Sequence, residues 1–318
     1  VVSPAIEKAK MKPVFIDSNQ SDFNMDWNIV REATSPKTKA IIATSIFGHP
    51  INGEEFRAFR KDFPNIIIVQ DCAHSFLAND AHKEGLAAFF GLNISKIITS
   101  IFGGMVTTDD PKFAVKVRKV REEMLVDGGI THEIKKSLYL TTVIASFTRP
   151  IYKVVNFLER KKLLNRFVKY YDPYIIDLPK DAFIKMGGVQ SRIGLVQCER
   201  YYKIVEHRRK ISKIYHKNLK GVLDFIMPPM HRNMTVSHFV IRTKYAERIK
   251  NECLFNNIQV GELIDYDCSE IPIYKNAKYY GYKKSKQFPK LVINLPVHVG
   301  LSELEAHKIC ALLKNIAG

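Results

Sequence analysis

Two charged residues are each surrounded in the sequence by apolar residues, and they are the first candidates for catalytic or binding residues. Asp71 ends the stretch NIIIVQD (65–71), and Lys96 is the only cation in GLNISKIITSIFGGMV (91–106). Taken singly, each has an ordinary structural explanation. The aspartate can cap a helix that follows a strand, and the lysine can lay its stem over apolar ground while its amine stays in water. Taken together, they indicate a site that uses an acid and an amine.

An enzyme that depends on pyridoxal phosphate (PLP) requires both groups. The amine forms the covalent link to the cofactor aldehyde, and the carboxylate keeps the pyridine nitrogen protonated so that the ring can withdraw electrons. The amine must lose its proton to attack an aldehyde, so apolar surroundings that lower its pKa are useful. The phosphate needs backbone N–H groups at a helix start or in a glycine-rich turn. Gly103 and Gly104 follow Lys96 closely and could supply such a turn.

The first 125 residues alternate short β-like runs with helical runs. The β-like runs are 13–17, 39–48 and 65–71, and the helical runs are 26–34 and 53–63. Strands that are apolar on both faces and separated by helices predict a mainly parallel sheet between helices. Ligands bind such sheets at the carboxyl ends of the strands, and Asp71 lies at one of these ends.

The pattern changes after this region. It predicts a basic helix at 111–125 that opens at Asp110 and Pro111, a break at 126–130, and a long helix at 187–219. The remaining residues are typical of a smaller α+β unit. Its last helix opens with Ser302 and Glu305, which form a capping box.

Composition limits the class of protein. A chain of 318 residues that is 46% hydrophobic can bury a large core. Five widely spaced cysteines without a Cys-x-x-Cys pair indicate no disulfide framework and no thiolate zinc site, and we expect no metal. We find no secretion signal and no uncharged apolar run of about eighteen residues, so we expect a cytoplasmic protein.

The formal charge of +17 favours anionic ligands. The Lys and Arg residues are spread along the chain, and no zinc finger, aromatic-basic RNA-binding signature or basic heptad array is present. We therefore expect no specific nucleic-acid partner. An anionic small substrate or a membrane surface explains the charge as well.

Several motifs resemble those of the DegT-type sugar aminotransferases, which are PLP enzymes of fold type I. PVFID and KTKAIIATSIFGHP resemble the family's strand pair and Gly-x-Pro turn, and QDCAHSF resembles its Asp-x-Ala-(His/Gln) motif. SKIITSIFGGMVTTDD resembles the lysine block of the family. Later family segments are matched in the same order by KMGGVQSRIGLVQ, RRKISKIYHKNL and LPVHVGLSELE.

The resemblance implies a role for each matched residue. Lys96 is expected to carry the cofactor, Asp71 to meet the pyridine nitrogen, and His74 to lie close to the ring, with Ala73 in the same motif. Asn93 and Ser95 are expected to replace part of the phosphate contacts, because the family's N-terminal phosphate-binding loop has no match here.

Four positions depart from the family pattern. Gly91 stands where the family has a phosphate-binding Ser, and Ile101-Phe102 stand where Gly-Glu is common. Phe183 aligns with the Asn that reaches the neighbouring subunit's cofactor. These departures favour an alternative, a catalytically inactive relative that binds a sugar nucleotide or a partner protein. A related sugar dehydratase would have His in place of Lys96, so the retained lysine argues against that class.

The sequence as a whole thus predicts an α/β, fold type I aminotransferase-like protein. Its parts are a large cofactor-binding domain at 1–130, a basic helical insert at 131–180, and a long helix with a small C-terminal domain at 181–318. The expected reaction transfers an amino group, from glutamate, to a keto sugar on a nucleotide diphosphate, for surface glycan or related biosynthesis. The resemblance also implies a homodimer whose active sites are shared between subunits.

Residues 131–180 contain ten Lys or Arg and four Asp or Glu. Within them, 133–171 predict two amphipathic helices that are separated at Pro150. One reading has these helices packed on the large domain with a solvated basic face. The other has the basic face on an anionic membrane. The basic residues concerned are Lys135, Lys136, Arg149, Lys153, Arg160, Lys161, Lys162, Arg166 and Lys169.

Overall fold

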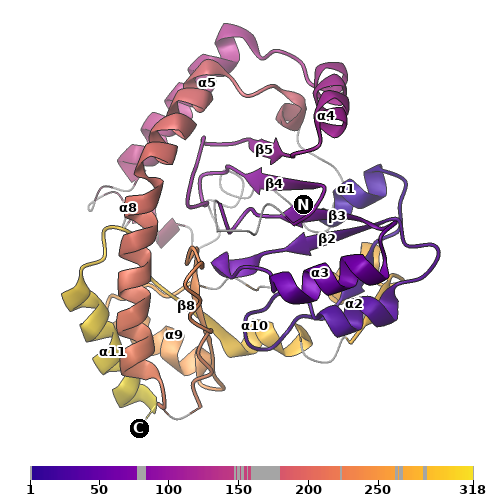
Figure 1. The fold of residues 1–318 in the computed structure, drawn as a ribbon. Coiled ribbons are helices and arrows are strands. Elements are labelled where there is room, and N and C mark those ends of the chain that lie inside the picture. The colour runs from indigo at the N-terminus through magenta and orange to yellow at the C-terminus, as the bar shows by residue number, and fades with distance from the viewer. Residues whose placement is uncertain are drawn as a thin grey trace.

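The computed structural model describes residues 2–76, 84–146, 180–222, 224–261, 268–281 and 285–317, with the isolated positions 148, 151, 154, 155, 157, 158 and 264. The centre of the molecule is a four-stranded sheet of order β2-β3-β4-β5 (Figure 1). β2, β3 and β4 run parallel, and β5 is antiparallel to β4. The predicted mainly parallel sheet between helices is confirmed.

The regular elements follow the chain in this order. The strands are β1 (Val14–Ile16), β2 (Ala40–Thr44), β3 (Ile67–Asp71), β4 (Ala87–Gly91), β5 (Gly104–Thr107), β6 (Phe239–Arg242), β7 (Lys278–Tyr280) and β8 (Val292–Leu295). The α-helices are α1 (Val2–Lys8), α2 (Trp27–Ala33), α3 (Gly53–Asp62), α4 (Pro111–Met124), α5 (Gly129–Ser146), α8 (Gly188–Leu219), α9 (Ala246–Phe255), α10 (Phe288–Leu291) and α11 (Glu303–Ala317). Short 3-10 turns are η1 (Ile46–Gly48), η2 (Lys180–Phe183), η3 (Cys268–Glu270), η4 (Pro272–Tyr274) and η5 (Ser285–Gln287).

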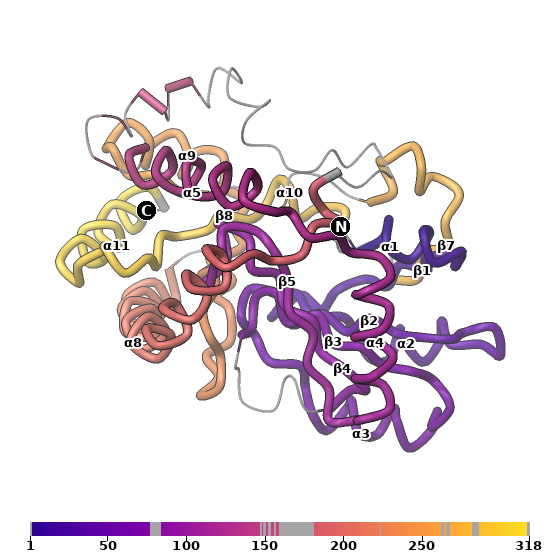
Figure 2. The backbone as a smooth tube through the Cα atoms, turned by 90° about the horizontal axis from the view of Figure 1, so that it is seen from above, coloured from indigo at the N-terminus to yellow at the C-terminus, as the bar shows by residue number. Residues whose placement is uncertain are grey.

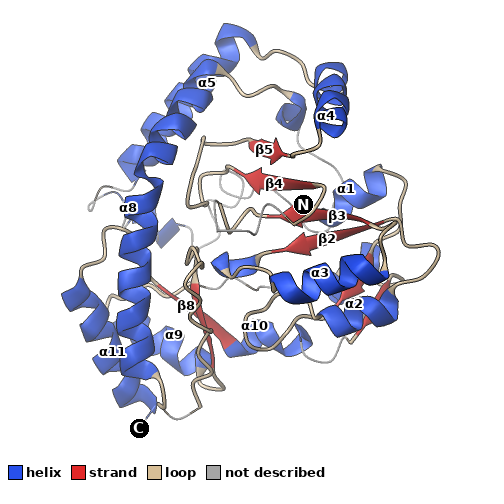
Figure 3. Cartoon of the chain, in the orientation of Figure 1, coloured by secondary structure: helices blue, strands red, loops and turns tan. Residues whose placement is uncertain are grey.

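Helices cover the sheet because their apolar residues recur on one side. In α3, Phe56 and Phe59 are fully buried and pack with Trp27 of α2 and Ile68 of β3. α8 contributes Tyr201 and Val205 to a second cluster that covers β4. Figure 3 shows α2 and α3 beside the strands and α8 along the opposite flank of the molecule. Both clusters lie on the same face of the sheet, so helices from distant parts of the chain pack on that face, whereas Ile67 and Val106 on the other face are about half exposed.

Two strand predictions need correction. The run 13–17 forms β1, but β1 pairs with β7 in a separate two-stranded parallel sheet and does not join the central one. It is short, and Val14 is exposed, so it is not a buried central strand. The predicted strand at 39–48 ends at Thr44, because Phe47 (φ 54°) and Gly48 (φ 89°) adopt left-handed backbone conformations that no strand accommodates.

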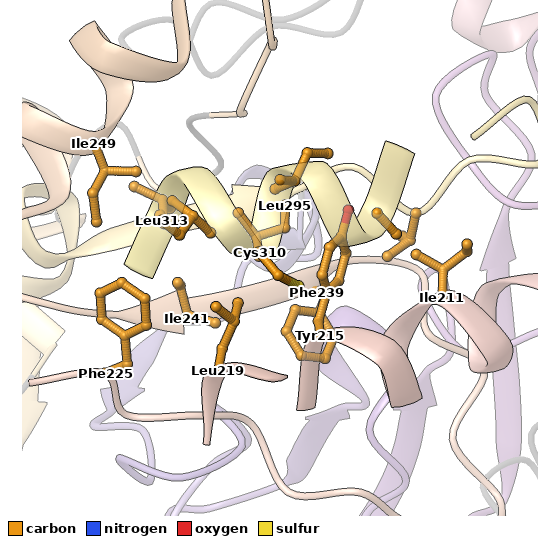
Figure 4. Packing of buried hydrophobic residues seen from close by; sticks show 14 of the residues in the cluster. Ile211, Tyr215, Leu219, Phe225, Phe239, Ile241, Ile249, Leu295, Cys310 and Leu313 are labelled. Atoms are coloured by element: carbon orange, nitrogen blue, oxygen red, sulfur yellow. The ribbon is translucent and has the colours of Figure 1, made fainter. Parts of the chain in front are cut away.

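The C-terminal unit has its own core. β6 and β8 form an antiparallel pair, and α9, α11 and the second half of α8 pack around it. Figure 4 shows Tyr215 and Leu219 of α8 facing Phe239, Ile241 and side chains of α11. The predicted capping box is confirmed, since the Glu305 N–H donates to Ser302 Oγ (3.2 Å) and the Ser302 N–H donates to Glu305 Oε2 (2.8 Å). The long helix predicted at 187–219 is also confirmed as α8.

α5 covers the first part of the predicted insert and begins inside the predicted break, at Gly129. It packs along α8, and Figure 2 shows the two helices on the same side of the sheet. Lys136 is buried on the inner side of α5, where its ammonium pairs with Asp181 (3.2 Å). The assignment of Lys136 to an exposed basic face is therefore wrong. Pro150 and the basic residues from Arg149 to Lys169 lie outside the described residues.

Exposed apolar side chains mark the outer side of α5. Ile130, Ile134, Leu138 and Ile144 are all more than half exposed. In the part of the chain that the structure describes, no helix is both long enough and apolar enough to cross a bilayer.

Candidate active site

The candidate site lies where three segments leave the carboxyl ends of β2, β3 and β4. Asp71 is the last residue of β3, and it is in register with Thr44 of β2 and Phe89 of β4. The Ser45 N–H donates to the Asp71 carbonyl (2.9 Å), and the Cys72 N–H donates to the Phe89 carbonyl (2.9 Å). Strands on both sides thus fix the backbone that carries the Asp71 carboxyl.

Asp71 is 9% exposed, and its side chain closes a tight turn. Its Oδ1 accepts a hydrogen bond from the Ala73 N–H (3.0 Å). Residues 72–76 form turns and no helix, so the reading of Asp71 as a helix cap is wrong. Burial raises the pKa of Asp71 above its usual value, while the Ala73 N–H and the Lys96 charge act in the opposite direction.

Lys96 approaches this turn from the segment after β4. Its backbone N–H donates to the Asn93 carbonyl (3.0 Å), and its side chain is half-buried. A Cβ placed on Gly91 would lie 3.6 Å from Lys96 Cε and 3.5 Å from Ala73 Cβ. Gly91 therefore lies beside both the lysine stem and Ala73. Burial lowers the pKa of Lys96, and the Asp71 carboxylate raises it.

Asp71 and Lys96 are electrostatically coupled. The Lys96 charge lowers the pKa of Asp71 and the Asp71 charge raises the pKa of Lys96, while burial pushes both groups toward their neutral forms. An amine whose pKa is lowered can accept and release a proton closer to neutral pH than an exposed lysine can. The structure thus brings together the acid and the amine that the sequence singled out.

His74 lies beside this pair and carries no charge. Its Nδ1 is buried and has no hydrogen-bond partner in the described structure. Burial, followed by the charge of Lys96 and by His238, lowers the pKa of His74 to about 2. The site therefore presents a neutral imidazole next to two ionisable groups.

His238 is a site residue that the sequence did not reveal. Its ring lies 5.1 Å from the His74 ring, and Phe47 lies 6.1 and 5.8 Å from His74 and His238, measured between ring centroids. Burial first, then Arg208 and Lys96, lower the pKa of His238 to about 4. A lone histidine before a buried strand is a weak signal, because its partners lie far away in the sequence.

Asn93 and Ser95 form a local turn near Lys96. The Ser95 N–H and Oγ both donate to Asn93 Oδ1, at 2.9 and 3.1 Å. Ser95 is exposed and Asn93 is half-buried. Their predicted contact with a phosphate stays a prediction.

The departures at Ile101 and Phe102 belong to a packed loop. Ile101 is fully buried with a left-handed backbone (φ 70°). The Phe102 carbonyl accepts a hydrogen bond from Gln190 Nε2 of α8 (2.5 Å), and Lys136 Nζ lies 4.5 Å from the centre of the Phe102 ring. Phe183 lies in η2, where its carbonyl accepts from the Val126 N–H (2.9 Å). α5 and α8 thus both contact the loop that follows Lys96.

The described residues contain no cluster of three His, Cys, Asp or Glu side chains that could hold a metal ion. The expectation that the protein needs no metal stays a prediction.

Comparison with known proteins decides the family. The model of the DegT/DnrJ/EryC1/StrS aminotransferase family matches residues 2–146 and 180–314. The chain belongs to this aminotransferase family. The two matched stretches leave out 147–179, which lie inside the predicted insert. Both the predicted family and the predicted enzyme class, a PLP-dependent aminotransferase, are thereby confirmed.

Individual relatives are distant but match over most of the chain. GDP-perosamine synthase of Escherichia coli O157:H7 is 23% identical, over 96% of this chain and 73% of the relative. A dTDP-4-amino-4,6-dideoxy-D-glucose transaminase of Escherichia coli is 22% identical, over 95% of this chain and 73% of the relative. Among solved structures, Spr1654 of Streptococcus pneumoniae, which carries the name of a sugar aminotransferase, matches with a TM-score of 0.70. It is 18% identical, over 98% of this chain and 77% of that chain, in its PMP form, and a PLP form is also solved.

The coupling of Asp71 to Lys96 makes a testable prediction. In the full-length protein without cofactor, Asp71→Asn removes the carboxylate that raises the Lys96 pKa, so more of the Lys96 amine is deprotonated at pH 8. The rate at which a small amine-specific reagent modifies Lys96 should rise by about two- to tenfold. Mass spectrometry of the peptide that contains Lys96 measures this rate.

Asp110→Asn is the matched control, because Asp110 caps α4 on the exposed surface. It should leave the Lys96 rate unchanged. An Asp71→Asn variant whose Lys96 reacts no faster than in the wild type would show that the two groups are not coupled.

Proposed function

We propose that the protein binds PLP between Asp71 and Lys96 and transfers an amino group to a keto sugar on a nucleotide diphosphate. The observation that carries this proposal is the pair of coupled, desolvated groups at the carboxyl edge of a parallel sheet. Membership of an aminotransferase family supports it, as do the names of the relatives, which include nucleotide-linked amino sugars.

The residues present fit this cofactor. Asp71 supplies a carboxylate for the pyridine nitrogen, and Lys96 supplies an amine for the aldehyde. The buried and unpartnered Nδ1 of His74 is a polar atom that lacks a protein partner in the described structure, as expected of a residue that faces a bound group. Asn93 and Ser95 are the residues of this region that could contact the phosphate, and Ala73 and the lysine stem both lie beside Gly91. When bound, PLP supplies an electron sink that stabilises negative charge on the carbon beside the amino group.

Each side chain then has a defined task. Lys96 Nζ, with its lowered pKa, accepts a proton from the Cα of the amino-acid donor and gives a proton to the carbonyl carbon of the sugar. Asp71 holds the proton on the pyridine nitrogen. His74 and His238 line the site as neutral rings, so they add no charge that would compete with Asp71. We take glutamate as the donor, and surface glycan or related biosynthesis as the setting.

The alternative is a relative that binds sugar nucleotide or a partner protein without turnover. Gly91 in place of a serine favours it, since no hydroxyl is offered to a phosphate there. The space at Gly91 is open, because a Cβ would make only ordinary contacts with Ala73 and Lys96. Retention of the Asp71–Lys96 pair favours the enzyme.

A labelling experiment separates the two functions. Borohydride treatment of the full-length protein with PLP should fix the cofactor on Lys96, as shown by peptide mapping, and Lys96→Arg should remove the label. Lys116→Arg, a change on the exposed surface of α4, is the control and should keep it. A wild-type protein that takes no label, or a label on another lysine, would contradict the proposed role of Lys96.

Turnover completes this test. The labelled site should exchange an amino group between L-glutamate and a nucleotide-linked keto sugar, and the coupled assay detects 2-oxoglutarate. Stable labelling without exchange across a panel of such sugars would favour the inactive relative.

We also propose that the active protein is a homodimer with shared sites, because Asn93 and Ser95 alone offer few groups to a phosphate. Light scattering of the full-length protein should give twice the subunit mass. A monomer with full activity would rule this out.

A cytoplasmic location with peripheral contact to an anionic membrane is the last part of the proposal. The exposed apolar side of α5 supports it, and the inward position of Lys136 weakens its electrostatic part. The full-length protein should sediment with anionic liposomes at low salt and less at moderate salt, because salt screens surface charge. Leu138→Asp on the outer side of α5 should reduce sedimentation, and Leu195→Asp on α8 is the control. Protein that stays in the supernatant at low salt would end the membrane proposal.

A further inference from the structure

Two adjacent arginines of α8 donate hydrogen bonds to the backbone carbonyls of a turn at residues 234–238. Arg208 Nη1 donates to the carbonyls of Val236 (3.2 Å) and Ser237 (2.8 Å), and Arg209 Nε donates to the Met234 carbonyl (2.7 Å). Arg208 forms no ion pair among the described residues, so peptide carbonyls alone compensate its charge. Burial lowers the pKa of Arg208 to about 10. Burying a guanidinium without a carboxylate partner costs free energy, so Arg208 depends on its hydrogen bonds to these carbonyls.

The turn itself is strained. Val236 is fully buried and has a left-handed backbone (φ 51°), which is unfavourable for a β-branched residue. Such a conformation persists only where its surroundings hold it. The hydrogen bonds from Arg208 to the carbonyls of Val236 and the next residue act on this conformation directly.

The turn is also seated against the large domain. The Thr235 N–H donates to the Gly48 carbonyl (3.0 Å), and Thr235 Oγ1 donates to the His74 carbonyl (2.9 Å). A Cβ on Gly48 would lie 2.7 Å from the backbone nitrogens of Val236 and Ser237, so no other residue fits there. The turn therefore joins α8 to the loops after β2 and β3.

His238 follows the turn directly, and the turn decides where its ring lies. The His238 N–H donates to the Phe47 carbonyl (3.3 Å), and Nδ1 lies 3.1 Å from Ser237 Oγ. The charged and titratable groups that face the ring come from three elements. They are His74 after β3, Lys96 after β4, and Arg208 on α8.

We propose that Arg208 is a positioning residue, which fixes the left-handed turn at Val236 so that the His238 imidazole lies against His74 at the Lys96 site. Arg208 does not act on the reacting atoms; it acts through the turn. This inference rests on the proposed function only where it concerns catalysis, because the ring geometry is a property of the protein without any ligand.

The first test measures the ring geometry by NMR of full-length protein with ¹³C-labelled histidine. His238→Asn assigns the His238 signal by its loss. In the wild type a nuclear Overhauser contact should join the His74 and His238 rings, and in Arg208→Met it should be lost. Methionine keeps the apolar part of the side chain, so the change removes mainly the donors and the charge.

The pKa of His238 gives a second readout in the same experiment. Burial and, after it, the charge of Arg208 lower this pKa, so removal of Arg208 should raise the midpoint of the His238 titration. Arg208→Lys keeps the positive charge but cannot span two carbonyls. It should keep the pKa low while weakening the ring contact. Arg209→Met is the matched control, because Arg209 contacts the same turn without facing His238, and it should change neither quantity.

Kinetics test the consequence for the site. With PLP bound, Arg208→Met should lower kcat/KM for the transfer from L-glutamate by about tenfold or more, and Arg209→Met by much less. Arg208→Lys should lie between the wild type and Arg208→Met.

The outcomes separate this inference from the proposed function. An unchanged ring contact and an unchanged His238 titration in Arg208→Met would overturn it, whatever the protein catalyses. If Arg208→Met does not fold, Arg208→Lys decides, and a wild-type ring contact in that variant would overturn it. A wild type that binds no PLP but shows the predicted NMR changes would refute the proposed function and leave the positioning role supported.

Discussion

Everything at the candidate site depends on keeping an acid and an amine together out of water. Burial drives Asp71 and Lys96 toward their neutral forms, and the attraction between their charges acts in the opposite direction. Loss of either charge therefore removes one of the effects that favour the charged form of the other group. The sheet makes this arrangement possible, because parallel strands end at one edge. β3 delivers the carboxyl there, and the segment after β4 delivers the amine.

The surroundings of this pair are built from distant parts of the chain. The turn at 234–238 carries His238 and is pinned by Arg208 on one side and by the loop at Gly48 on the other. Gln190 and Lys136 hold Phe102, and thereby the loop that follows Lys96, from α8 and α5. The first helix of the predicted insert is thus part of the support of the site, whatever its outer side contacts.

Two kinds of contact hold the site residues in place at the edge of the sheet. Main-chain hydrogen bonds between strands fix Asp71, and they are formed whatever side chain stands at that position. Side-chain contacts fix His238, and they depend on particular residues such as Arg208 and Gly48. Substitutions near Asp71 should therefore change chemistry more than geometry, whereas those around the turn should change geometry first.

Local patterns in the sequence were sufficient to predict β2 and β3, the caps at Asp110 and Ser302, the long helix α8, and the choice of Asp71 and Lys96 as candidates for one site, but they did not predict β4 or β5. These features depend on residues close together in the chain, where periodicity, capping chemistry and isolated charges are visible. Only the tertiary structure decided that β1 leaves the central sheet for β7, that the strand after Lys39 stops at Thr44, and that Lys136 turns inward to Asp181. Only the tertiary structure places the His238 ring beside the His74 ring and brings Arg208 into contact with the turn that precedes His238. Such contacts join residues far apart in the chain, and their free energy comes from burial and from hydrogen bonds that exist only once distant elements have packed together.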